Sequence, residues 1–188
     1  QFGLRPVDLF EDVGWLSERS WGAHVVRPNA DEIARLGAAG VGIAHCPSSN
    51  MILSSGIAPV VQMRHAGCHV GLGCDGSSSA DSASLWQEAR LAMLQGKLIS
   101  GADQMDARTA LEIATRGGAA CLGRNGEIGE LSIGAVGDVA VWKLEGPQFA
   151  GVIDDPIEGW LRCGPVSAAH VFVHGRAIVE NGVLANPG

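Results

Sequence analysis

Three short apolar runs in the first half of the chain each end in a side chain that can bind a metal or carry a proton. The runs begin at Trp21, Val41 and His69, and they end at His24, His45 and Asp75. Steps of 21 and 30 residues separate the three end points, and these lengths suit a strand followed by a helix. The pattern predicts successive β-α units, with parallel strands whose carboxyl ends lie at one edge of a sheet.

Helical periodicity fills the intervals between these runs. Pro6 suits the first turn of a helix, and Asn29 suits the cap of another. Gly40 and Gly67 stand where the second and third helices should end. We expect helices at residues 6–16, 29–39, 57–66, 81–98 and 106–121, and a loop at residues 47–50.

The pattern changes after Gly123, where glycines divide the chain into short segments. Strands are expected at residues 138–142, 169–174 and 177–180, the last two joined by a tight turn. We therefore divide the chain into residues 1–123, with three β-α units, and residues 124–188, with a small β structure.

Composition narrows the class of protein. The net charge of −7 argues against nucleic acid as a partner, and no apolar stretch reaches the length of a membrane span. Five cysteines without a Cys-x-x-Cys pair favour free thiols over a disulfide framework. The sequence therefore predicts a cytoplasmic protein with a well-buried core.

Histidine and aspartate at neighbouring strand ends suit a metal site or general acid–base chemistry. Each residue also has a structural alternative: Asp75 as a turn residue, His24 as a core histidine and His45 as a strand cap. The glycines at 71, 73 and 76 match a dinucleotide-binding pattern, although the expected acidic residue about 20 positions later is missing. A small nucleotide-binding α/β domain therefore stays open as an alternative.

The strings Gly-Ala-His24, Ala-His45-Cys-Pro-Ser-Ser-Asn50 and Gly-Leu-Gly-Cys-Asp75-Gly-Ser resemble the last three strand ends of the amidohydrolase superfamily. The similarity is greatest to its branch of 8-oxoguanine, guanine and cytosine deaminases and hydroxytriazine hydrolases. Strings in 114–123, 129–138 and 173–182 resemble the same family. The resemblance implies an α/β fold: the C-terminal portion of a (β/α)8 TIM barrel, with strands six to eight, and part of a small composite β-sandwich.

The same resemblance assigns roles to the three side chains. Asp75 would be the metal ligand of the eighth strand and the proton shuttle. His24 would orient the attacking water or the substrate, and His45 would support substrate binding. The implied activity is metal-dependent hydrolytic deamination of a purine-like ring such as 8-oxoguanine, with Zn²⁺ or Fe²⁺ in the intact enzyme.

One departure from the family pattern is large. No His-x-His occurs in the chain, and the fifth-strand histidine is also absent. We therefore expect the chain to be part of a longer protein, to bind metal weakly or not at all by itself, and to be inactive alone. Its expected partners are the missing N-terminal half of the barrel, a heterocyclic substrate and further copies of itself. The alternative is a non-catalytic half-barrel that is stable only by association.

Overall fold

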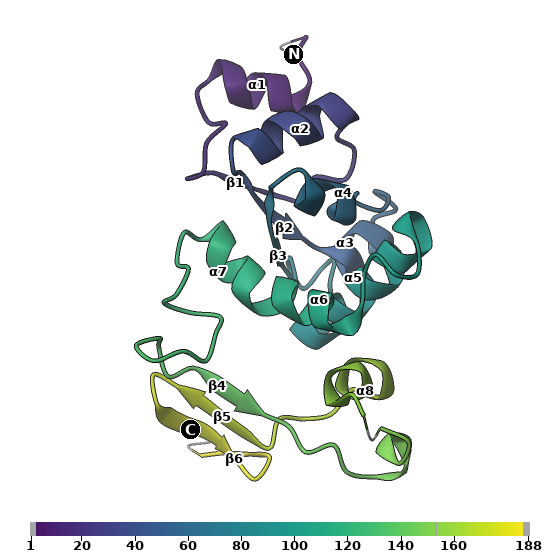
Figure 1. Cartoon of the computed structure of the whole chain (residues 1–188), viewed down its shortest axis with the longest axis vertical. Helices are drawn as coiled ribbons and strands as arrows, with labels where there is room; N and C mark the ends of the chain where they lie inside the picture. The colour runs from purple at the N-terminus through teal and green to yellow at the C-terminus, as the bar shows by residue number, and fades with distance from the viewer. Residues whose placement is uncertain (1–2, 153, 186–188) are drawn as a thin grey trace.

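The computed structural model describes residues 3–152 and 154–185 of the chain. It contains two sheets at some distance from each other (Figure 1). A three-stranded sheet with surrounding helices makes up the larger part, and a four-stranded sheet lies at the end opposite to α1. Within the described residues, no helix is long and apolar enough to cross a lipid bilayer.

The larger sheet consists of β1 (Trp21–Ala23), β2 (Gly42–His45) and β3 (His69–Leu72) in that order. Both pairs of neighbours are parallel, with Ala23 opposite Ala44 and Ala44 opposite Gly71. The predicted parallel arrangement is thus confirmed. It places the carboxyl ends of the three strands side by side, as parallel pairing in register requires.

The helices of this part follow the expected order, with corrections at several positions. They are α1 (Pro6–Asp12), α2 (Ala30–Ala38), α3 (Pro47–Ile52), α4 (Val60–His65), α5 (Leu85–Ser100), α6 (Ala107–Glu112), the π-helix η1 (Ile113–Gly117) and α7 (Gly118–Cys121). The loop expected at residues 47–50 was wrong: Pro47 occupies the first turn of α3, where its missing N–H costs nothing. The helix expected from residue 81 begins at Leu85, after an N-cap at Ser84.

Helix α2 begins with a complete capping box. The side chain of Asn29 accepts from the Glu32 amide at 2.8 Å, and the Glu32 carboxylate accepts from the Asn29 amide at 2.7 Å. Glu32 is buried, and Arg5 donates two hydrogen bonds of 2.7 Å to it from the start of α1. These bonds from Arg5 are the main reason that the pKa of Glu32 is lowered.

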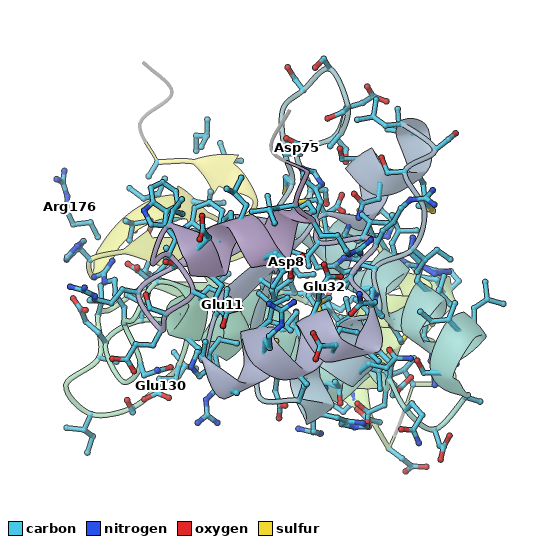
Figure 2. The ribbon with its side chains drawn as sticks, turned by 90° about the horizontal axis from the view of Figure 1, so that it is seen from above. Asp8, Glu11, Glu32, Asp75, Glu130 and Arg176 are labelled. Carbon is cyan, nitrogen blue, oxygen red and sulfur yellow. The ribbon has the colours of Figure 1, made fainter. Side chains whose placement is uncertain are left out.

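A second ion network joins α1 to α2. Arg35 on α2 contacts Asp8 and Glu11 on α1, each at 2.6 Å, and Asp31 on its own helix at 3.0 Å. Figure 2 shows Asp8, Glu11 and Glu32 together around α1 and α2, with Asp75 away from them. These ion pairs therefore link α1 to α2.

The core lies between the sheet and its helices. Its largest fully buried apolar side chains are Ile43, Met63, Met93, Met105, Ile113 and Leu161. The run formed by α6, η1 and α7 packs very closely on β3, because Gly117 carries no side chain there. A Cβ added at Gly117 would lie 2.0 Å from the Val70 oxygen.

The second sheet is antiparallel and has the order β4 (Val139–Val141), β5 (His170–Val173), β6 (Arg176–Glu180) and β7 (Val183–Leu184). The three strands expected in this region are present, and β7 adds one that the sequence pattern did not predict. A short turn of 3-10 helix, η2 (Pro147–Phe149), and helix α8 (Pro156–Cys163) precede β5.

Helix α8 links the two parts of the chain. Leu161 on α8 is fully buried in the same cluster as Met105 and Ile113. The ring of Trp160 meets Trp86 of α5 edge to face, at a centroid distance of 6.5 Å. Residues after 123 thus complete the core of the first part, while the division at residues 123 and 124 stays a prediction.

Candidate active site

The three residues singled out in the sequence stand at the carboxyl edge of the parallel sheet. His24 directly follows β1, His45 is the last residue of β2, and Asp75 lies three residues beyond β3. The amide of His24 donates to the Ala44 oxygen at 2.9 Å, which continues the strand pairing up to the site. The fold therefore brings all three to one edge, as the strand pattern predicts.

Asp75 has a backbone conformation that few residues adopt. Its φ is 61°, and that of His24 is 68°. Left-handed conformations cost energy in residues other than glycine, although aspartate and histidine adopt them more often than most. Such strain is concentrated at functional sites. Here the two residues follow β1 and β3, on either side of β2, and their side chains approach each other.

The carboxylate of Asp75 is held by two hydroxyl groups. Ser49 on α3 donates to Oδ2 at 2.5 Å, and Ser79 donates to the same oxygen at 3.0 Å. The bond from Ser49, followed by the Gly76 amide and Ser79, lowers the pKa of Asp75, because hydrogen bonds to a carboxylate favour its charged form. Asp75 is therefore an anion at neutral pH, partly exposed at the edge of the sheet.

His24 lies between Asp75 and α3. Its Nε2 is 3.6 Å from Oδ2 of Asp75, and its Nδ1 is 2.9 Å from Oδ1 of Asn50. An amide oxygen accepts hydrogen bonds, so in a neutral imidazole this contact requires the proton on Nδ1. The lone pair of Nε2 then faces the side of the ring where Asp75 lies.

His45 has a different environment. Its side chain is buried with 1% exposure, and its Nδ1 has no hydrogen-bond partner in the described part of the chain. Burial, with a smaller contribution from nearby His24, lowers the pKa of His45 to about 4. A neutral, buried imidazole can shape the floor of the site, while direct contact of His45 with a substrate stays a prediction.

The sequence pattern missed the helix that supports these residues. Ser49 and Asn50 are fully buried on α3, and each contacts one of the two exposed site residues. The signal was present in the string that follows His45, where a proline suited to the first turn of a helix precedes two serines and an asparagine. Once these residues form a helix, successive positions reach both Asp75 and His24.

The described residues do not by themselves form a metal site. A catalytic zinc ion takes at least three protein ligands, and within residues 3–152 and 154–185 no group of three or more histidine, cysteine, aspartate or glutamate side chains is placed to hold an ion. Asp75 fits one position of such a set. Its two hydroxyl partners both bind Oδ2, so neither of them occupies Oδ1.

Comparison with known proteins identifies the family of the chain. The profile of the amidohydrolase family matches residues 2–178. The chain belongs to the amidohydrolase family. This assignment confirms the resemblance of the three strand-end strings, and it favours a hydrolase over a nucleotide-binding domain.

Curated relatives of this amidohydrolase chain include two deaminases. It is 47% identical over 184 residues to an 8-oxoguanine deaminase of Pseudomonas aeruginosa. The aligned region covers 98% of this chain and 40% of that relative. It is 44% identical over 155 residues to a 5-methylthioadenosine/S-adenosylhomocysteine deaminase of Halobacterium salinarum. Here the aligned region covers 82% of this chain and 36% of that relative. The chain thus spans about two fifths or less of the length of these relatives.

A solved structure has the same fold over the whole chain. The atrazine chlorohydrolase of Arthrobacter aurescens TC1, crystallised with zinc, superposes with a TM-score of 0.93 and 36% sequence identity. The match covers 100% of this chain and 42% of the hydrolase. The fold of the chain is therefore that of part of an amidohydrolase.

Proposed function

We propose that the protein to which this chain belongs is a hydrolytic deaminase that removes an exocyclic amine from a purine-like ring, with 8-oxoguanine as the first substrate to test. The proposal rests on the approach of His24, which follows β1, to Asp75, which follows β3, with Nε2 and Oδ2 3.6 Å apart. The names of the curated relatives support the reaction class and the heterocyclic substrate. The chain would contribute the last three strands of a TIM barrel and part of a composite β-sandwich.

The two side chains suit proton transfer to and from water. Asp75 is ionised, and Nε2 of His24 carries a lone pair when Nδ1–H faces Asn50. A water molecule between these acceptors would give one proton to Asp75 while its oxygen attacks the ring carbon that bears the amine. Asp75 would then return the proton to the amine nitrogen, the C–N bond would break, and ammonia would leave. The proton that remains on the attacking oxygen would pass to the ring nitrogen as the ring carbon becomes a carbonyl.

A metal ion belongs to the proposal only for the whole protein. Asp75 would supply one ligand, and the others would come from residues outside this chain. Zinc is favoured because the solved chlorohydrolase was crystallised with it, and iron is the alternative that metal analysis would detect. His45 would support the substrate from beneath without being exposed.

The test is release of ammonia by the whole protein from 8-oxoguanine, guanine, cytosine and hydroxyatrazine. Asp75→Asn should reduce turnover at least about a hundredfold, because it removes the proton acceptor. Asp81→Asn is the matched control: it neutralises an exposed carboxylate of the same loop and should leave turnover unchanged. Absence of ammonia from all four compounds would refute the substrate class, and full activity of Asp75→Asn would refute the role of Asp75.

A second candidate, a non-catalytic part that is stable only by association, is favoured by the apolar surface of the chain. A cavity of about 360 Å³ between α1, β1 and α2 is lined mainly by apolar groups, among them Phe10, Val25 and Ile43. Leu98 and Ile99 on α5 are exposed. Solution mass and metal content of the 188-residue chain separate the two cases, because a monomer with stoichiometric zinc would contradict the need for association.

A further inference from the structure

Helix α3 depends on a residue of another helix for its first turn. The first amides of a helix have no carbonyl partner within it, and the side chain of Cys46, the N-cap of α3, does not cap them. The carboxylate of Glu88 on α5 serves as the acceptor for one of these amides. Its Oε2 accepts from the Ser48 amide at 2.9 Å in a fully buried contact. Gln87, next to it on α5, adds a bond of 3.4 Å to the Ser48 hydroxyl.

Glu88 is an unusual residue for this position. Its side chain is 1% exposed, and the described residues include no ion pair to it. Burying a carboxylate costs free energy unless hydrogen bonds within the protein replace those that it makes with water. Its contact with Ser48 links it to α3 across 40 residues of sequence.

The two residues that follow Ser48 contact the two exposed residues of the site. Ser49 donates to Oδ2 of Asp75 at 2.5 Å, and Asn50 faces Nδ1 of His24 at 2.9 Å. The positions of both site residues thus depend on the start of a six-residue helix, and α5 fixes that start through Glu88. Burial and then the charges of Asp75 and Glu88 raise the pKa of the Cys46 thiol to about 11, which agrees with both carboxylates lying near this turn.

We propose that Glu88 is a positioning residue of the active site, which fixes the first turn of α3 and through Ser49 and Asn50 sets the orientation of Asp75 and His24. This inference rests on the proposed function for its catalytic consequence, but not for its structural one. The required group is a buried hydrogen-bond acceptor, so a glutamine should replace Glu88 and an alanine should not.

The test compares Glu88→Ala, Glu88→Gln and the control Leu94→Ala in the whole protein, with Leu94 an exposed residue of the same helix. Glu88→Ala should lower kcat about tenfold or more, as expected from one lost buried hydrogen bond to a charged group. KM should change less than about twofold, because the substrate contacts remain. Glu88→Gln should restore kcat. The double variant with Ser49→Ala should lose less than the sum of the two single losses, since part of the effect of Glu88 passes through Ser49.

Two measurements that need no activity complete the test. Hydrogen exchange of the segment 46–53 should accelerate in Glu88→Ala alone, and the ¹⁵N shifts of His24 should lose the pattern of the Nδ1–H form. If Glu88→Ala matches Leu94→Ala in exchange, in the His24 spectrum and in kcat, the proposal is wrong. If the unmodified protein releases no ammonia, the proposed function fails, and exchange and the His24 spectrum still decide whether Glu88 positions α3.

Discussion

Two adjacent glycines offer a matched pair for testing how closely α6, η1 and α7 pack on β3. Gly117 and Gly118 both have helical backbone angles, with φ of −61° and −62°. A Cβ at Gly117 would lie 2.0 Å from the Val70 oxygen of β3, whereas a Cβ at Gly118 would meet nothing within 4 Å. The same substitution to alanine therefore probes packing at one position and helix propensity alone at the other.

The expected magnitudes follow from these two environments. Alanine in place of glycine inside a helix gains about 0.5 to 1 kcal/mol at either position. At Gly117 this gain is offset by overpacking, because the helix or the strand must move by about 1 Å or more to relieve the contact with a backbone atom; such strain costs about 1 to 3 kcal/mol. The propensity gain cancels in the comparison, so Gly117→Ala should be less stable than Gly118→Ala by about 1 to 3 kcal/mol.

Thermal and urea unfolding followed by circular dichroism measure this difference. For a chain of this size, 1 kcal/mol corresponds to about 2 to 4 °C in Tm, so the two variants should differ by about 2 to 12 °C. Gly118→Ala should be as stable as the unmodified chain or more so. Equal stability of the two variants, or a more stable Gly117→Ala, would show that β3 does not pack against this helix as described.

Three further predictions concern buried polar groups. Folding lowers the pKa of His45 to about 4, so the unfolded chain binds the proton at a higher pH than the folded chain does. The free energy of unfolding should therefore fall as the pH drops from about 6.5 to about 4. In urea unfolding, His45→Gln should flatten this slope by up to about 1.4 kcal/mol per pH unit. Arg5→Met should lower the free energy of unfolding, since it removes two charge-assisted bonds to buried Glu32. Burial raises the pKa of the Cys46 and Cys68 thiols to about 11, so maleimide labelling at pH 8 should be slow when the chain is folded and fast in urea.

Each of these has an outcome that would contradict it. An unchanged pH slope in His45→Gln would mean that the imidazole is not buried in a neutral form. Arg19→Met replaces an arginine with no hydrogen bond or ion pair among the described residues, and an equal loss in both arginine variants would deny the importance of the bond to Glu32. Rapid labelling of folded protein at Cys46 would show that the first turn of α3 opens readily.

The sequence pattern was sufficient for the parallel sheet because strand burial and helix capping are local properties. Asn29 and Glu32 form the capping box that their spacing allows, and helix α2 begins next to them. The apolar run that begins at Val41 forms a strand that stops at His45. The loop predicted at residues 47–50 was wrong because a proline after a strand suits a loop as well as the first turn of a helix.

Helix α3 required tertiary information. Six residues are too few for a helix to be stable by local propensity, and the group that completes its first turn, Glu88, is 40 positions away. Helix α8 is similar, because Leu161 is buried only when the chain folds back onto α5 and α6. Neither contact leaves a periodic trace in the residues nearby.

Local sequence thus determined which side chains could do chemistry, since strand alternation placed His24, His45 and Asp75 at three successive strand ends. Only the tertiary structure decided which of them meet and in which form. It brought Nε2 of His24 to within 3.6 Å of Asp75 and buried His45 beside them. The reason is that a distance between strand ends depends on long-range pairing, and a pKa depends on burial and on partners that the folded chain alone brings together.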